Sequence, residues 1–165
     1  MKSNAIMRLG VLLLSFGVAS NAIAQDTIPI KTLPPVTVTA TTKKVPEKVW
    51  YSFKDYFSTV SNPQWYKLNK NYLASFILDE DKNNALFTQR GNLVYHISYG
   101  YEKSLPEELR KQVKGVYFDY DITRAIKVIG ADRLIWVINL EDAKNLIMVR
   151  LEEGEMEEVK RLDKM

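Results

Sequence analysis

One arrangement of segments occurs twice after residue 45, and this repetition constrains the fold more than any other feature of the sequence. In its first copy, Pro46 suits the first turn of a helix. The apolar residues that then recur at helical spacing are Val49, Phe53, Tyr56, Phe57 and Val60. This spacing predicts an amphipathic helix of about four turns that ends before Asn62.

The second copy begins at Ser104. Ser104 and Glu107 are three residues apart and predict a capping box, with Pro106 in the first helical turn. The buried stripe of this helix is expected to consist of Leu109, Val113 and Val116. The two predicted helices therefore start about 58 residues apart.

Strand segments follow each helix in the same order. The predicted strands of the first copy are residues 65–68, 72–78, 85–89 and 93–99. Those of the second copy are residues 126–129, 133–140, 146–151 and 155–162. Gly91 and Gly154 mark the last turn of each copy, and corresponding features recur at offsets of 58 to 63 residues. We therefore predict an α+β fold, a tandem repeat of one helix followed by about four antiparallel β-strands, with repeats at 46–103 and 104–165.

The last strand of each copy has a pattern of its own. Because Leu93, Tyr95, Ile97 and Tyr99 alternate along one strand, we expect them to share its covered face. His96 then falls on the opposite face, at a partly exposed position. The last segment is also compatible with a helix, and we assign a strand to residues 155–162 by analogy with the first copy.

The first 24 residues have the pattern of a secretory signal peptide. Lys2 and Arg8 precede an apolar run from Leu9 to Ala19, and an Ala-x-Ala site ends at Ala24. The run is too short to span a bilayer, which takes about 20 apolar residues; a retained anchor is the alternative reading. We predict cleavage after Ala24, a periplasmic or secreted location, and no integral membrane segment after cleavage.

Residues 25–45 predict a disordered linker, since they contain three prolines, six threonines and no aromatic residue. Within this linker, residues 36–40 alternate and have β propensity. The run resembles the leading segment of plug domains in TonB-dependent outer-membrane receptors. The alternative is a spacer that pairs with a sheet edge.

The repeat region resembles a known family. The motifs that carry the resemblance are Trp65-Tyr66-Lys67-Leu68, Tyr72-Leu73-Ala74-Ser75-Phe76 and the turn Gly91-Asn92. Together with a paired repeat after an export signal, they resemble the β-lactamase-inhibitor-like, PepSY-like periplasmic proteins of Bacteroidetes-type bacteria over residues 46–165. The resemblance implies an α+β fold of helix-plus-sheet units and a non-enzymatic, inhibitor-like or binding role. Leu93 stands where many relatives carry an aromatic residue, so no inhibitory contact is carried over by residue.

Few residues are available for catalysis or metal binding. The chain has no cysteine, which excludes disulfides, thiolate zinc sites and cysteine nucleophiles. His96 is the one histidine, and neither a Gly-x-Ser-x-Gly nor a Gly-x-x-x-x-Gly-Lys motif occurs. Residues 79–84 resemble the start of a calcium loop, but Asn84 and Arg90 replace its required glycine and glutamate. A turn that uses the left-handed tolerance of Asn83 or Asn84 explains this segment better. We predict no metal, no cofactor and no enzymatic activity.

The charged residues do not indicate nucleic-acid binding. The 23 basic and 20 acidic residues are mixed along the chain, and loss of residues 1–24 removes two basic residues and no acidic one. Residues 152–158 form an acidic patch, predicted to be a solvated hairpin with docking to a basic partner as the alternative. A hydrolase built from two carboxylates stays a third reading, because the sequence singles out no pair.

Aromatic residues supply the candidate binding site. Nine tyrosines and three tryptophans exceed what a small core encloses, and aromatic side chains are enriched at the energetic centres of interfaces. The candidate binding residues, each with core packing as the alternative, are Trp50, Tyr51, Trp65, Tyr66, Tyr99 and Tyr101. Our leading hypothesis is a module that presents one sheet face to an envelope protein, for which a protease or another envelope enzyme is a candidate. The alternative is a small-molecule or glycan sensor, and the oligomeric state stays open.

Overall fold

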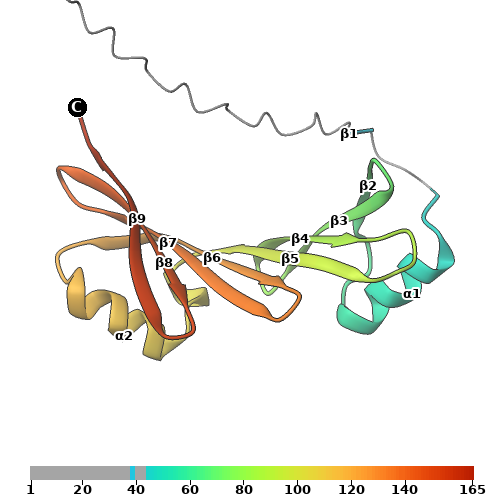
Figure 1. Cartoon of the computed structure of the whole chain (residues 1–165), viewed down its shortest axis with the longest axis horizontal. Coiled ribbons are helices and arrows are strands. Elements are labelled where there is room, and N and C mark those ends of the chain that lie inside the picture. Colours follow the sequence, from blue (N-terminus) through green and yellow to red (C-terminus); the bar gives the residue numbers. More distant parts are fainter. Residues whose placement is uncertain (1–37, 40–43) are drawn as a thin grey trace, which may run out of the picture. The chain divides into compact units, whose positions relative to one another are not determined.

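The computed structural model describes residues 38–39 and 44–165, which form one antiparallel sheet and two α-helices (Figure 1). The elements are β1 Val38–Thr39, α1 Glu47–Tyr56, β2 Gln64–Leu68, β3 Asn71–Leu78, β4 Asp81–Phe87, β5 Leu93–Gly100, the 3-10 helix η1 Glu102–Ser104, α2 Glu107–Val116, β6 Asp121–Gly130, β7 Arg133–Glu141, β8 Asn145–Glu152 and β9 Glu155–Asp163. Each strand pairs with its neighbours in chain order. The predicted α+β class is confirmed, and one helix precedes each group of four strands.

The predicted signal peptide lies outside the described residues, as does most of the predicted linker. From the linker, Val38 and Thr39 form β1, which pairs antiparallel with Leu68 and Lys67 at the edge of the sheet. Neither helix in the described part of the chain is long and apolar enough to cross a membrane.

Both helices pack on the same face of the sheet. Ala85, in the core under α1, lies opposite His96 on β5. Gly100 lies four residues farther along β5, on the same side of the strand. It lies opposite Ala125, which belongs to the core under α2. Because residues directly opposite each other share a face, the two cores lie on one side of the sheet. We call this side the helix face and the other side the open face.

The core under α1 is aromatic. Phe53 is fully buried, and its ring centroid lies 5.3 Å from those of Phe57 and Trp65 and 5.2 Å from that of Phe76. The contacts with Trp65 and Phe76 are edge-to-face, an arrangement that adds to the energy of area burial. Phe53 therefore ties α1 to strands β2 and β3.

The core under α2 is mainly aliphatic. Its buried residues are Leu105, Val113, Ile122, Ala125, Trp136, Ile138, Leu140, Ile147, Val149 and Leu151. Tyr117 and Tyr120, just after the helix, pack against this core with ring centroids 5.7 Å apart. The second half of the sheet is thus covered mostly through branched side chains.

The first helix is shorter than predicted. It ends at Tyr56 rather than before Asn62, because Phe57 leaves helical geometry with φ −132° and ψ 58°. The Lys54 ammonium donates hydrogen bonds to the carbonyls of Ser58 and Val60, which satisfies acceptors that follow the helix. Val60 still reaches the core, through an irregular segment and not through a helical turn.

The second helix lacks the capping box that the sequence predicts. Ser104 belongs to η1, where its hydroxyl accepts a hydrogen bond from the Tyr101 N–H at 3.4 Å, and Pro106 is the N-cap of α2 without a side-chain bond. Val116, predicted to be buried, is exposed, and Tyr117 packs on the core in its place.

Strand β4 begins four residues earlier than predicted. The turn before it consists of Asp79 and Glu80, which have positive φ values of 52° and 67°. Asn83 and Asn84 are therefore strand residues, and the prediction that one of them makes the left-handed turn is wrong. At the end of the chain, β9 confirms the strand assignment of the last segment.

The predicted covered face of β5 is wrong for three of its four residues. An irregularity between Leu86 and Phe87 sets Leu86 opposite Tyr95 but Phe87 opposite Leu93. This bulge reverses the alternation, so Leu93 packs on the core while Tyr95, Ile97 and Tyr99 lie on the open face. His96 occupies the helix face and is only 8% exposed.

The turn between β4 and β5 docks tightly on α1, which gives a stability prediction. Gly91 has φ 94°, and a Cβ there would lie 2.9 Å from the Lys48 carbonyl oxygen and 2.9 Å from the Ser52 hydroxyl. We expect Gly91→Ala to lower the free energy of unfolding by about 2 kcal/mol, measured by urea denaturation.

Gly115 is the matched control. It lies in α2, and a Cβ added there would meet no atom within 4 Å. Gly115→Ala should therefore raise the free energy of unfolding by about 0.5 kcal/mol, because alanine is the better helix former. Equal denaturation midpoints for Gly91→Ala and the wild type would contradict the docking of this turn.

Candidate functional site

An apolar stripe crosses the centre of the open face. In the strand register, Ile97 lies opposite Val128, and Tyr99 lies opposite Ile126. The stripe continues onto β7, and its members, which we call the central stripe, are Ile97, Tyr99, Ile126, Val128, Ile135 and Val137. All six are half-buried, and both helices lie on the other side of the sheet. An antiparallel sheet with one solvated face normally carries polar residues there, so the stripe is not explained by the core.

A shallow depression of about 690 Å³ adjoins the stripe. Tyr99 and Ile126 of the stripe line it, together with Ile77, which is 64% exposed. The Arg124 guanidinium carbon lies 4.2 Å from the centroid of the Tyr101 ring, and both side chains line the same depression. This cation–π contact holds a charged group over the face of an aromatic ring at an accessible surface.

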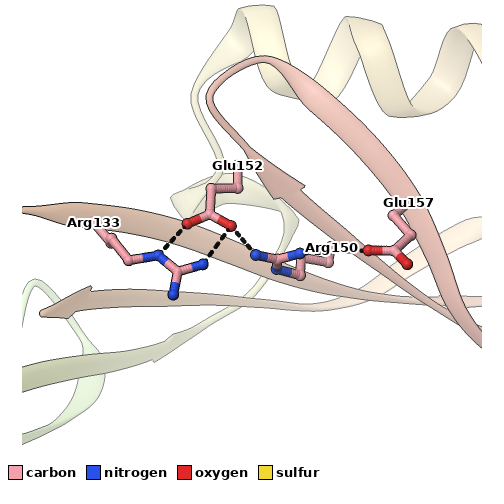
Figure 2. Close-up of polar contacts among 4 residues, drawn as sticks. All are labelled: Arg133, Arg150, Glu152 and Glu157. Atoms are coloured by element: carbon pink, nitrogen blue, oxygen red, sulfur yellow. Dashed lines mark hydrogen bonds and ion pairs between the residues drawn. The ribbon is translucent and has the colours of Figure 1, made fainter.

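An ion-pair network occupies another part of the open face (Figure 2). The Arg133 guanidinium makes two hydrogen bonds to the Glu152 carboxylate, at 2.5 and 2.8 Å. Arg150 also bonds Glu152, and it lies 3.4 Å from the Glu157 carboxylate. Glu152 is shared between two arginines, so the charges of this network compensate one another.

His96 is a buried structural residue and not the partly exposed one predicted. Its Nε2 lies 2.8 Å from the Asn83 side-chain oxygen, and the Asn83 amide nitrogen donates to the carbonyls of Leu78 and Asp81. Because those two bonds fix the amide orientation, Nε2 must be the donor to the oxygen, which selects the Nε2–H tautomer. Burial lowers the pKa of His96, and the nearby Lys127 lowers it further. The ring is thus held neutral between β4 and β5.

The depressed pKa predicts a pH dependence of stability. The folded state disfavours protonation below the ordinary value of 6.5, while the unfolded chain takes up the proton. The contribution of His96 is therefore present above pH 6.5 and is lost as the pH falls through the folded-state pKa. Urea denaturation at about pH 7.5 and about pH 5.5 should show lower stability at the acidic value. His96→Gln should flatten this difference, and an equal decline in the variant would contradict the assignment.

Three of the six predicted binding residues, Trp50, Tyr51 and Trp65, do not lie on the open face. Trp65 is only 7% exposed and lies in the aromatic core against Phe53. Trp50 lies on α1 with its ring stacked 6.1 Å from Phe53. Tyr51, also on α1, is 65% exposed. These three belong to the helix side: Trp65 is part of the core, whereas Trp50 is 36% exposed, and a binding role for them stays a prediction.

The other three predicted residues lie on or beside the open face. Tyr66 on β2 lies opposite Leu73 on β3, and Leu73 lies opposite Leu86 on β4, so the three share one face of the sheet. Tyr99 and Tyr101 come together at the depression. A binding role for these tyrosines stays a prediction.

Sequence reasoning misses most of the central stripe. It predicts strands at residues 126–129 and 133–140, but it does not say which of their residues face away from the helices. The available signal is the continuous apolar run Leu134-Ile135-Trp136-Val137-Ile138, because a strand that is apolar on both sides predicts contact on both sides. Lys82 falls in a predicted turn, and Arg124 lies before the predicted start of its strand.

Comparisons with known proteins identify the fold. No protein-family model and no curated protein matches the chain. Among solved structures, a BLIP-like protein from Bacteroides fragilis is 14% identical with a TM-score of 0.57, and the match covers 81% of this chain and 89% of that one. A DUF2874 family protein from Bacteroides ovatus is 16% identical with a TM-score of 0.57, over 74% of this chain and 89% of that one. A provisionally assigned periplasmic protein from Bacteroides eggerthii is 14% identical with a TM-score of 0.55, over 73% and 89%.

These neighbours agree with the resemblance to β-lactamase-inhibitor-like (BLIP-like) proteins that the sequence indicates, and at this level of identity they show a shared fold. None of the three is described as PepSY-like, so that part of the resemblance stays a prediction.

Proposed function

We propose that this chain, which has the fold of BLIP-like and DUF2874 proteins, is an exported, non-enzymatic binding module that presents its open face to a protein of the cell envelope. The observation that carries the proposal is the central stripe. Six apolar or aromatic side chains lie side by side on a sheet face that the helices leave free, and their removal from water by a partner is favourable. A protease or another envelope enzyme is a candidate partner.

Two features support a role without catalysis. His96, the one histidine, is largely buried, and its Nε2–H is engaged with the Asn83 amide oxygen, so Nε2 is not free to accept a proton. The carboxylates of Glu152 and Glu157 on the open face both bond Arg150, so each already has a cationic partner within the chain.

Export is supported by the signal-peptide pattern of residues 1–24. The periplasmic assignment of the neighbour from Bacteroides eggerthii supports the same location. We infer a periplasmic or secreted protein with cleavage after Ala24.

We also infer that the two halves are copies of one unit. Both helices have ten residues, with N-caps at Pro46 and Pro106. The turn before the last strand of each half contains a glycine with positive φ, Gly91 in the first half and Gly154 in the second. Equal helix lengths and equivalent turn glycines are what a duplicated helix-plus-strands unit predicts.

Photo-crosslinking in cells tests the binding face. We would place p-benzoylphenylalanine at Val137 of the central stripe and, as the control, at Tyr51 on the helix side. The proposal predicts one discrete crosslinked protein from position 137 and none from position 51. Crosslinks from position 51 alone, or none from either position, would contradict it.

The alternative function is a small-molecule or glycan sensor. The depression favours it, because the Tyr99 and Tyr101 rings and the Arg124 guanidinium offer stacking and hydrogen bonding to a saccharide. Isothermal titration calorimetry with envelope saccharides tests this alternative. Saturable binding that Tyr101→Ala abolishes would support it, and no heat from any saccharide would remove it.

A further inference from the structure

Four cations of the open face form two pairs with different electrostatic environments. Arg133 and Arg150 are bonded to glutamates of the network in Figure 2. Lys82 and Arg124, beside the depression, make no ion pair with any residue that the structure describes. The nearby Glu80 does not serve them, since its carboxylate pairs with Lys103.

Both unpaired cations adjoin the central stripe. Lys82 lies opposite Tyr99, and Tyr99 lies opposite Ile126, so the three form one row across the open face. Arg124 precedes Ile126 by two residues on β6 and therefore points to the same face. Any partner that covers the stripe also removes water from these two cations.

A desolvated cation needs a compensating anion. Burying an unpaired charge is strongly unfavourable, whereas a carboxylate in hydrogen-bond contact offsets most of that cost. The chain itself supplies no carboxylate for Lys82 or Arg124 in its described part, so the partner must. Asn84 and Asn139 also line the depression, and their buried side-chain oxygens accept no hydrogen bond from described residues.

We infer that the open face recognises an acidic polypeptide segment, in which an Asp or Glu carboxylate lies between Lys82 and Arg124 and the flanking apolar side chains contact the central stripe. This inference rests on the proposed function and specifies the chemistry of the partner. The ion-paired arginines of the network contribute to the surface without requiring a partner charge.

The test uses the 15N-labelled mature chain and two blocked peptides. The probe is acetyl-Leu-Asp-Glu-Leu-amide, and the matched control is acetyl-Leu-Asn-Gln-Leu-amide. We expect saturable NMR shifts at the backbone amides of Tyr99 and Arg124 with the acidic peptide only. Lys82→Gln and Arg124→Gln should each raise the dissociation constant about three- to fivefold, the range of an exposed ion pair. Arg133→Gln removes the same charge from an already compensated site and should leave the dissociation constant unchanged.

Three results would overturn the inference: equal shifts with the amide peptide, no saturable shift with the acidic one, or an equal loss in Arg133→Gln and Arg124→Gln. Crosslinking from Val137 separates this failure from failure of the proposed function. If the crosslinked protein is still captured by a Lys82→Gln/Arg124→Gln chain at undiminished yield, the open face binds a partner but not through a carboxylate.

Discussion

Phe53→Ala is expected to destabilise the protein by about 4 kcal/mol, more than any other single truncation in the first half of the sheet. Phe53 is fully buried, and its ring contacts Phe57, Trp65 and Phe76 at centroid distances of 5.2 to 5.3 Å. Truncation leaves a cavity between α1 and the sheet that rigid aromatic neighbours cannot fill. Guanidinium denaturation followed by far-UV circular dichroism measures the change.

Phe118 supplies the control for this prediction. It follows α2 and is 75% exposed, so Phe118→Ala removes the same atoms without opening a cavity. We expect the denaturation midpoint of Phe118→Ala to stay within the range of ordinary surface substitutions, about 0.5 kcal/mol. Similar losses for the two variants would show that Phe53 does not hold α1 on the sheet.

Tyr99→Ala is expected to weaken partner binding by about thirtyfold, which corresponds to the roughly 2 kcal/mol of an aromatic hot spot. Tyr99 sits where the central stripe meets the depression, so its ring borders the apolar residues and the unpaired Lys82. The dissociation constant is measured with the protein captured by crosslinking from Val137. Stability should change little, because Tyr99 lies on the side of the sheet away from both cores.

Tyr51→Ala is the matched control on the helix side. Tyr51 is 65% exposed on α1, on the side of the sheet opposite the open face, where we expect no contact with a partner. Its loss should leave the dissociation constant unchanged. If Tyr51→Ala weakens binding as much as Tyr99→Ala, the partner does not dock on the open face.

The order of elements could be predicted from local patterns. Apolar spacing located both helices, and paired glycines at Gly91 and Gly154 located the turns before β5 and β9. Helix ends could not be predicted, because they depend on tertiary contacts. The Lys54 ammonium satisfies carbonyls after α1, and Ser104 serves η1 instead of capping α2.

The faces of the strands could not be predicted, for two physical reasons. A bulge opposite Phe87 shifts the alternation of β5 by one residue, and nothing local in residues 93–99 announces it. The central strands are apolar on both sides, so alternation does not distinguish the core from the open face. The aromatic surplus indicates Tyr99 and Tyr101 as candidates, but Lys82 and Arg124 become visible only when the register brings them to the same depression.

Site-specific thiol labelling tests the central claim most directly. The chain has no cysteine, so Val128→Cys on the central stripe and Tyr51→Cys on α1 each provide a single reactive thiol. The rate of maleimide labelling would be measured with and without the partner protein that crosslinking from Val137 identifies. We expect the partner to slow labelling at Val128→Cys and to leave the labelling rate at Tyr51→Cys unchanged. Unchanged labelling at Val128→Cys under saturating partner, with slowing at Tyr51→Cys, would contradict it.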